Sequence, residues 1–431
     1  MSAGMRHDFG GYVRRVRARG EVVVQPRMGF GEPSRMRAGL TAVAATAAAT
    51  AGTITVDSYT RLRDYAGVRT AISTGGDLNG YPIVTAGEAT TREVVRDLGD
   101  DFPIQVRHGS PAPMDIVRAM TAAGLYATEG GPLSYCLPYS RLPVAESVDN
   151  WRRTAELLAA LDGPDVKPHL ETFGGCMMGQ LCPPELLIAI SVLEALFFRQ
   201  HGLRSVSLSY TQQTDHQQDQ EALLALRQLA GEYLADIDWH VVLYTYMGVF
   251  PRTPEGAQRL SRQAARLAVD GAADRLIVKT TVESQRIPTI AENTAALLAA
   301  ADELAATDRA RAAESPDTIL SDARALIEAT LELSPDIGSA LTEALRRGYL
   351  DVPFCLHPDN SRQAISRIDR NGRLTWLCVG SMPLRRPSAG VPELTSAALL
   401  ADLGHVAAHF DGLGHFPGPT PEPAPRHRRI R

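Results

Sequence analysis

Lysine is almost absent from this sequence. Of its 44 lysine and arginine residues, only Lys167 and Lys279 are lysines, so 42 are arginines. Because arginine serves wherever a general positive charge is needed, a retained lysine indicates a position that needs its particular shape or pKa. We therefore treat Lys279, at the end of an apolar run, as a candidate functional residue.

Cysteine pairs and an excess of basic charge are also missing. The five cysteines are odd in number and none belongs to a C-x-x-C pair. This pattern disfavours disulfides and zinc and favours a reduced, cytoplasmic interior. The net charge is −5 and the pI is near 6.1, so no basic surface indicates nucleic-acid binding.

Long apolar runs are lacking as well. The nearest candidate for a membrane span, residues 38–52, is alanine-rich and shorter than the about 18–20 apolar residues that a span requires. The N-terminus has no apolar signal core, so we expect no secretion signal. With 431 residues, of which 44% are hydrophobic, the chain can bury one large barrel and an appendage.

Eight short apolar runs alternate with helical patterns. Their hydrophobicity is continuous along each run, which is typical of parallel strands buried on both faces. The runs are 22–27, 53–58, 104–109, 126–130, 167–173, 205–210, 240–246 and 276–281. Eight such strands joined by helices predict an α/β fold, specifically a (β/α)8 TIM-type barrel.

A doubly wound open sheet is the competing fold. It would usually carry a glycine-rich phosphate loop after its first strand. Residues 25–31 occupy that position and read QPRMGFG, without the G-x-G-x-x-G spacing. The sequence therefore disfavours a dinucleotide-binding fold.

The chain divides into four predicted parts. An N-terminal arm, 1–20, precedes the barrel at 21–288, and a helical and small α+β region follows at 289–417. Within that region, Asn371-Gly372 predicts a β-hairpin with a type I′ turn. The proline-rich, charged tail at 418–431 is predicted to be disordered.

Charged side chains stand where the predicted strands end. Catalytic residues of barrel enzymes lie at these carboxyl ends, and here they include Arg27, Arg61 and Arg107. Three arginines at one mouth need anionic partners. Glu129 and Glu171 can neutralise two of them, and the remaining charge suits a small ligand whose carboxylates accept bidentate hydrogen bonds.

The loop after the fourth run adds further candidates. Residues 129–139 read EGGPLSYCLPY, and the glycines allow the backbone to approach a ligand closely. Tyr135 and Tyr139 can donate hydrogen bonds while their rings form the wall of a pocket. Lys279 and Glu283 close the eighth run on the same predicted face.

Several strings of the sequence carry a family resemblance. They are QPRMG at 25–29, TVDSYTR at 55–61, LNGYP at 78–82, RHGSP at 107–111, EGGPLSYCLPY at 129–139, ETFG at 171–174, MGVFP at 247–251, IVKTTVESQRIPT at 277–289 and DVPF at 351–354. With these strings, most of residues 21–355 resembles the large subunit of adenosylcobalamin-dependent glutamate mutase, also called methylaspartate mutase.

The resemblance implies a set of substrate contacts. A claw around the substrate carboxylates falls on Arg27, Arg61 and Arg107. The residue that contacts the substrate amino group falls on Glu129, with Tyr135 and Tyr139 assisting it. The implied reaction is a radical rearrangement of (S)-glutamate to (2S,3S)-3-methylaspartate, in which the cofactor performs the chemistry and the protein orients and encloses it.

The resemblance also implies an adenosylcobalamin site without metal ligands from this chain. Lys279 and Glu283 match the positions that hold the adenosyl ribose, and Asn79 matches one near the adenosyl group. The full set of predicted cofactor-binding residues is Gly29, Thr55, Asn79, Pro138, Glu171, Lys279 and Glu283.

A partner is implied by a missing motif. In the family, a separate small cobalamin-binding subunit carries a D-x-H-x-x-G motif, and this chain has none. The nearest match, Asp238-Trp239-His240, has Leu243 where the glycine should be. We therefore expect a small subunit as partner, with a homodimer of this chain in a heterotetramer as one arrangement.

Two other functions fit the same residues. One is a barrel aldolase or lyase in which Lys279 forms a Schiff base. The other is a divergent or non-catalytic barrel that binds a related acidic amino acid without cobalamin.

Overall fold

The computed structural model describes residues 7–99, 101–174, 181–308, 317–385 and 394–412. Eight parallel strands form one sheet in the order β1-β8-β7-β6-β5-β4-β3-β2. The strands are β1 Val23–Pro26, β2 Gly52–Thr55, β3 Ile104–Arg107, β4 Ala127–Glu129, β5 His169–Glu171, β6 Ser205–Thr211, β7 Asp238–Tyr244 and β8 Arg275–Val278. Each overlaps one predicted run.

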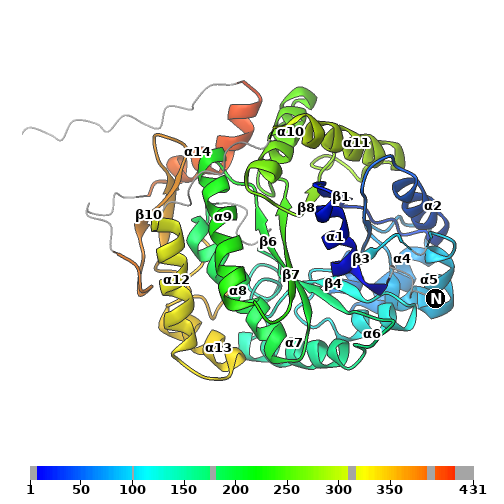
Figure 1. Ribbon diagram of the computed structural model, residues 1–431, viewed down its shortest axis with the longest axis horizontal. Helices are drawn as coiled ribbons and strands as arrows, with labels where there is room; N and C mark the ends of the chain where they lie inside the picture. The colour runs from blue at the N-terminus through cyan, green and yellow to red at the C-terminus, as the bar shows by residue number, and fades with distance from the viewer. Residues whose placement is uncertain (1–6, 100, 175–180, 309–316, 386–393, 413–431) are drawn as a thin grey trace, which may run out of the picture.

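Backbone hydrogen bonds join β1 to the segment before β2. Val24 N donates to Ala49 O at 2.9 Å, and Ala51 N donates to Val24 O at 3.3 Å. These bonds bring the two ends of the sheet together, and the predicted (β/α)8 barrel is confirmed (Figure 1). The fourth strand is one residue shorter than its run at each end, and the chain turns after it at Gly130, whose φ is +128°.

Helices surround the sheet on its outer face. Those of the barrel and of the insertions after β2 are α2 Pro33–Ala44, α3 Ser58–Arg61, α4 Tyr65–Ser73, α5 Ile83–Val95, α6 Met114–Ala122, α7 Val144–Ala159, α8 Pro184–Gln200, α9 His216–Tyr233 and α10 Pro254–Asp270. Within the described part of the chain, no helix is both long and apolar enough to cross a membrane.

The N-terminal helix α1, Phe9–Ala18, crosses the amino-terminal end of the barrel (Figure 1). Phe9, Val13 and Val16 are buried against Val23 and Ala127 at the start of two strands. Asp8 caps the helix by accepting a hydrogen bond from the backbone of its first turn at 2.8 Å. This helix therefore closes the end of the barrel opposite the strand carboxyl termini.

The interior of the barrel is polar, although barrel interiors are usually filled by branched apolar residues. Side chains along a strand alternate between its two faces, and the inward positions meet in layers. The middle layer contains Gln25, Thr53, Gln105, Glu171, Ser207 and Arg275. The layer nearer the carboxyl ends contains Arg107, Glu129 and Tyr244.

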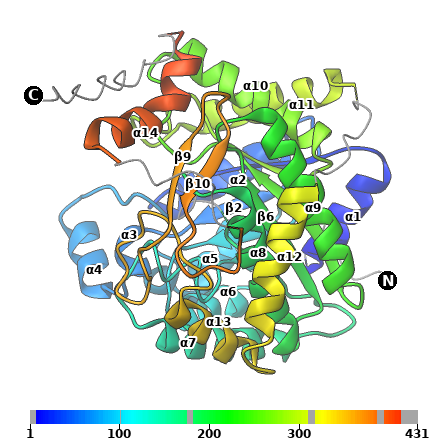
Figure 2. The ribbon, with the colours of Figure 1, turned by 90° about the vertical axis from the view of Figure 1, so that its left-hand side faces the viewer.

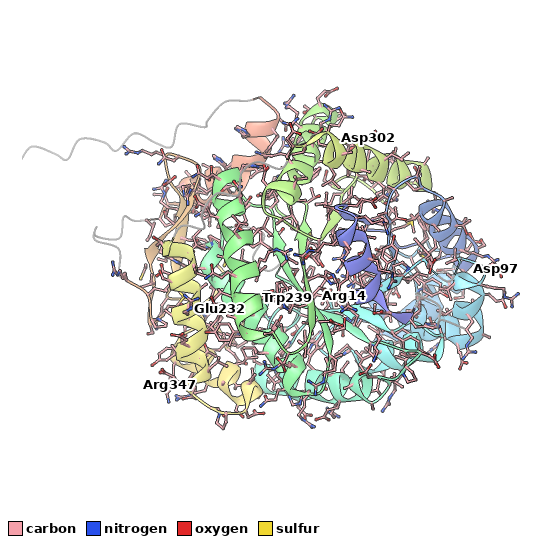
Figure 3. All side chains as sticks on the ribbon, viewed as in Figure 1. Arg14, Asp97, Glu232, Trp239, Asp302 and Arg347 are labelled. Carbon is pink, nitrogen blue, oxygen red and sulfur yellow. The ribbon has the colours of Figure 1, made fainter. Side chains whose placement is uncertain are left out.

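α11 Ile290–Ala306 packs against β1 and β8 between α10 and α2 and is the eighth helix around the barrel (Figure 1). The rest of the C-terminal region covers one side of the barrel and comprises α12 Asp317–Leu331, α13 Ile337–Arg347, β9 Ile365–Ile368, β10 Leu374–Cys378 and α14 Ser396–Phe410. Figures 1 and 2 show α12 running beside α8 and α9. Charged side chains cover the outer helix faces (Figure 3), and Glu232 of α9 pairs with Arg324 of α12 at 2.6 Å.

The predicted hairpin is confirmed, but its predicted turn type is wrong. β9 and β10 pair antiparallel around Asn371-Gly372. A type I′ turn needs positive φ at both central residues, and here only Gly372 has it, at +87°. Asp369 explains the difference, because its Oδ1 accepts hydrogen bonds from the backbones of Asn371 at 2.8 Å and Arg373 at 3.0 Å and fixes a longer loop. The predicted disordered tail, 418–431, lies outside the described residues.

Candidate active site

The short helix α3, Ser58–Arg61, holds Arg61 at the carboxyl end of the barrel. Asp57 caps this helix, since its Oδ1 accepts from two backbone N–H groups of the first turn at 2.9 and 3.0 Å. Asn79 Oδ1 accepts from the backbone N–H of Ser58 at 2.9 Å. Asn79, predicted to lie near the cofactor, therefore also braces the helix that carries Arg61.

Arg107 and Glu129 form a buried ion pair at the mouth. Arg107 Nε donates to Glu129 Oε2 at 2.7 Å, and the two side chains are only 4% and 2% exposed. Tyr135 and Tyr244 also donate to Glu129, the latter at 2.8 Å. Burial lowers the pKa of Arg107, but the charge of Glu129 outweighs it and the net pKa lies above its ordinary value.

Several buried polar atoms at this end have no hydrogen-bond partner among the described residues. Among them are Nη1 of Arg107, Nε of Arg61 and Oε2 of Glu283. A buried polar group left unpaired costs about 1–3 kcal/mol, so a ligand that pairs them would gain that energy. The two donors suit anionic oxygens, and the carboxylate oxygen suits a hydroxyl or an ammonium.

Arg27, Lys279 and Glu283 gather on the side of the mouth where β1 pairs with β8. Arg27 Nη1 donates to Glu283 Oε1 at 2.7 Å. Lys279 Nζ donates to the backbone oxygen of Tyr246 at 3.2 Å and lies 4.4 Å from the centre of the Phe250 ring. The structure therefore brings one claw arginine and both predicted ribose contacts together.

The loop after β4 needs glycine at position 130. Gly130 has a φ of +128°, and a Cβ there would lie 2.4 Å from the Tyr135 ring and 2.5 Å from Trp151. The close approach places Tyr135 against Glu129. The rings of Tyr135 and Tyr139 meet edge to face with centroids 5.8 Å apart, so the two predicted tyrosines line one wall.

Glu194 of α8 binds the backbone of the same loop. Its Oε1 accepts from the backbone N–H groups of Leu133 and Ser134 at 2.8 and 2.9 Å. Glu194 is fully buried. Burial raises its pKa to about 7, although the hydrogen bonds from the loop act in the opposite direction. Sequence reasoning missed this residue.

We expect Glu194→Gln to flatten the pH dependence of stability. The folded-state pKa of about 7 lies above the ordinary 4.5, so the unfolded chain releases this proton first as the pH rises. The stability that Glu194 contributes below pH 4.5 is therefore lost as the pH rises to about 7, by about 3 kcal/mol. Urea unfolding at pH 5 and pH 8 measures the difference.

The exposed Glu328→Gln on α12 is the control for that comparison, and it should keep the pH dependence of the wild type. If the unfolding free energy of Glu194→Gln falls between pH 5 and pH 8 as steeply as that of the wild type, Glu194 does not titrate as argued.

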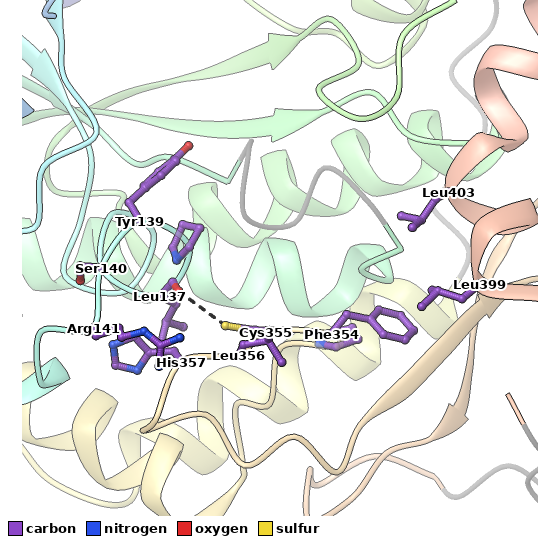
Figure 4. A pocket seen from close by; sticks show the side chains of 12 residues that line it. Leu137, Tyr139, Ser140, Arg141, Phe354, Cys355, Leu356, His357, Leu399 and Leu403 are labelled. Carbon is purple, nitrogen blue, oxygen red and sulfur yellow. Dashed lines mark hydrogen bonds between the residues drawn. The ribbon is translucent and has the colours of Figure 1, made fainter. Parts of the chain in front are cut away.

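A cleft of about 720 Å³ opens beside the tyrosine wall (Figure 4). Pro138 and Tyr139 line one side of it, and Phe354, Leu356 and Leu403 lie on the others. Pro138, predicted to face the cobalamin, thus borders an open cleft between the loop after β4, the segment 353–357 and α14.

Gly29 and Thr55, also predicted to face the cofactor, lie against each other. A Cβ on Gly29 would lie 2.5 Å from the backbone oxygen of Thr55. Since real Cβ atoms do not approach a backbone oxygen so closely, only glycine fits here without displacing the chain after β1.

Glu171 lies beneath Glu129 and is fully buried. Its Oε2 accepts from Ser207 Oγ at 3.0 Å, from Gln105 Nε2 at 3.1 Å and from Arg275. Its Oε1 accepts from Tyr244. The protein itself therefore occupies both oxygens of this predicted cofactor contact.

Sequence reasoning missed the polar middle layer. Gln25, Gln105 and Arg275 interrupt or border apolar runs, and two of them stand two positions before a claw arginine on the same strand face. A polar residue two positions before a functional one is the signal that could have found them, because side chains two apart share a face.

Fold and site together define the class of this protein. Ionised side chains from β1, β3, β4 and β8 converge at the carboxyl ends of a parallel barrel, where barrel enzymes carry their active sites. The protein is an α/β-barrel enzyme.

Comparison with known proteins gives the family. A sequence model described as Methylaspartate mutase E chain (MutE) matches residues 5–393. The chain is 30% identical over 348 residues to the glutamate mutase epsilon subunit of Escherichia coli O157:H7, covering 77% of this chain and 72% of that one. It is 32% identical over 333 residues to the protein of that name from Haloarcula marismortui, covering 74% and 68%. The chain belongs to the methylaspartate mutase E chain family and is an isomerase of that type.

Proposed function

We propose that this chain is the catalytic subunit of a cobalamin-dependent radical mutase that interconverts (S)-glutamate and (2S,3S)-3-methylaspartate. The observation that carries the proposal is the buried Arg107–Glu129 pair, beside which Arg107 Nη1 and Arg61 Nε have no partners among the described residues. An amino dicarboxylate has carboxylates that can accept from these donors and an ammonium that can donate to Glu129.

The charges of such a substrate match the mouth. Its carboxylates accept from the guanidinium groups of Arg27, Arg61 and Arg107, whose planar forks suit bidentate contact. Its ammonium donates to Glu129, which already accepts from Arg107, Tyr135 and Tyr244. Arginine holds anions without readily giving up a proton, so the claw fixes both substrate and product in their ionised forms.

The residues on the β1–β8 side fit an adenosyl group. Glu283 Oε2 is a buried acceptor without a partner among the described residues, which suits a ribose hydroxyl, and Lys279, four positions earlier, contributes donors. When bound, adenosylcobalamin supplies the radical chemistry that removes and returns a substrate hydrogen. The chain orients the substrate and, through the buried ring of Tyr135, excludes water from it.

A separate small subunit completes the cobalamin site in this proposal. The curated relatives carry the name of a subunit, and this sequence has no D-x-H-x-x-G motif. The cleft beside Pro138 has an apolar border, in which Phe354 and Leu356 are 38% and 73% exposed. A subunit that covers this border would bury both side chains.

The environment of Lys279 disfavours the Schiff-base alternative. Its position over the Phe250 ring, with a backbone oxygen as acceptor, favours the charged ammonium. The nucleophile of a Schiff-base enzyme is the neutral amine, so borohydride with a carbonyl substrate should trap no adduct at Lys279.

Reconstitution tests the proposed function. This chain, mixed with a candidate small subunit, adenosylcobalamin and glutamate, should give a cob(II)alamin signal by electron paramagnetic resonance and form methylaspartate. Omission of the small subunit should abolish both. If several small subunits are tried and neither signal nor product forms with any of them, the proposal is wrong.

A further inference from the structure

Tyr244, the last residue of β7, places its phenol between two buried carboxylates. Its hydroxyl lies 2.8 Å from Glu129 Oε2 and also contacts Glu171 Oε1. Glu129 and Glu171 are partners in register on the neighbouring strands β4 and β5. All three side chains are at most 2% exposed, so this contact is shielded from bulk solvent.

The phenol has one hydrogen for two acceptors. A tyrosine hydroxyl donates a single hydrogen bond, and burial raises the pKa of Tyr244 well above its ordinary value, with Arg107 acting against that rise. The hydroxyl therefore stays protonated. Its one hydrogen can lie toward Glu129 or toward Glu171, and it separates two negative groups that would otherwise face each other.

The two carboxylates depend on this hydrogen unequally. Glu129 Oε2 also accepts from Arg107, whereas Glu171 Oε1 accepts from no described residue other than Tyr244. Glu171 is in turn fixed by Arg275, which is fully buried in the middle layer. Tyr244 thus connects the substrate-facing Glu129 to the ion pair in the barrel core.

We propose that Tyr244 is a positioning residue for substrate recognition, which keeps Glu129 aligned with the substrate ammonium through a hydrogen that it shares with Glu171. This inference rests on the proposed function, in which Glu129 binds the amino group. The proposal predicts how removal of the phenolic hydroxyl changes the protonation of Glu129. Removing the phenolic hydroxyl takes a donor from Glu129 and exposes it to the charge of Glu171, and both changes favour protonation of Glu129.

Other charged and titratable groups also face Glu129, and the substitution of Tyr244 leaves their identities unchanged. They are Arg107 of β3, His108 after β3, Tyr135 of the following loop, Glu171 of β5 and Arg275 of β8. Burial lowers the pKa of His108 to about 4, so this ring is neutral over the range of the test.

The test compares Tyr244→Phe with Tyr210→Phe. Tyr210 is a matched control, because its buried hydroxyl also donates to a carboxylate, Asp219 Oδ1, at 2.8 Å. That bond runs outward from β6 to α9 and does not touch the Glu129 network. Both variants lose a buried phenol–carboxylate hydrogen bond, and both should lose a similar amount of stability.

The first measurement needs only the chain itself, glutamate and glutarate. Glutarate lacks the amino group, so the ratio of the two dissociation constants reports the Glu129–ammonium contact. In the wild type, the preference for glutamate should disappear as acid protonates Glu129. In Tyr244→Phe, this loss should occur about one pH unit higher, and in Tyr210→Phe it should not move.

The second measurement uses the reconstituted enzyme. Tyr244→Phe should lower kcat by about 10- to 100-fold, change the KM for glutamate at pH 8 less than threefold, and move the acid limb of kcat/KM upward. An unmoved acid limb with kcat within twofold of the wild type would overturn the proposal, as would an equal shift in Tyr210→Phe.

The binding measurement distinguishes a failure of the proposed function from a failure of the role assigned to Tyr244. If the wild-type chain shows no preference for glutamate over glutarate at any pH, the amino-dicarboxylate assignment itself is wrong. If the preference exists and its pH dependence is the same in Tyr244→Phe, only the role of Tyr244 is wrong.

Discussion

Arg107→Lys is expected to lower kcat/KM for glutamate by at least about 100-fold. The guanidinium presents two separate donors: Nε donates to Glu129 Oε2 at 2.7 Å, and Nη1 is buried at the mouth without a partner among the described residues. An ammonium group carries the same charge but cannot present both donors in one plane. Either the Glu129 contact or the substrate contact is lost, and the loss falls on both kcat and KM.

Steady-state kinetics of the reconstituted enzyme measure this effect. Arg118→Lys, on the exposed face of α6, is the matched control and should keep wild-type kinetics. Thermal unfolding of both variants separates loss of the site from loss of the fold. Activity of Arg107→Lys within a few-fold of the wild type would remove Arg107 from the claw.

The strands could be predicted because each stands in a continuous apolar run. Closing the sheet then makes β1 and β8 neighbours, so the closeness of Arg27 and Glu283 follows from the fold although 256 positions separate them. The choice of partner does not follow, because an arginine at a mouth can pair with any carboxylate there. Only side-chain geometry shows that Arg27 pairs with Glu283 and Arg107 with Glu129.

The barrel interior was not predictable from local patterns. Arg275 stands one residue before the predicted eighth run, where a charged residue normally marks the strand boundary. Its partner Glu171 lies 104 positions earlier, and only the meeting of the two strands makes Arg275 a core residue. Glu194 was missed for a similar reason, since it supports Leu133 from a helix 61 positions later.

The partners of Glu171 could not be predicted from its local sequence. Glu171 stands near the end of a predicted run, as Glu129 does, and the two residues are partners in register. Three donors of the middle layer nevertheless take its Oε2, whereas Glu129 is held by donors of the mouth. These core donors, which come from three other strands, could be identified only from the folded barrel.

Glu129→Gln is expected to cause the largest loss of activity, about 1,000-fold in kcat/KM for glutamate. Glutamine keeps the shape of the side chain but presents no charge to the ammonium. It also leaves Arg107, 4% exposed, as a buried cation without its counter-ion, which should lower the unfolding free energy by about 3 kcal/mol. Kinetics and chemical unfolding measure the two effects separately.

Glutarate identifies the cause of the kinetic loss. If Glu129 acts on the amino group, Glu129→Gln should weaken glutamate binding strongly and glutarate binding at most slightly, so that the two ligands bind alike. An equal weakening of both would place the damage in the carboxylate claw, through a displaced Arg107. Glu146→Gln, on the exposed first turn of α7, removes a carboxylate outside the pair and should preserve the preference for glutamate. A preserved preference in Glu129→Gln would mean that another group binds the ammonium. Among the described residues, Glu129 is the only carboxylate that accepts hydrogen bonds from Arg107, Tyr135 and Tyr244 together.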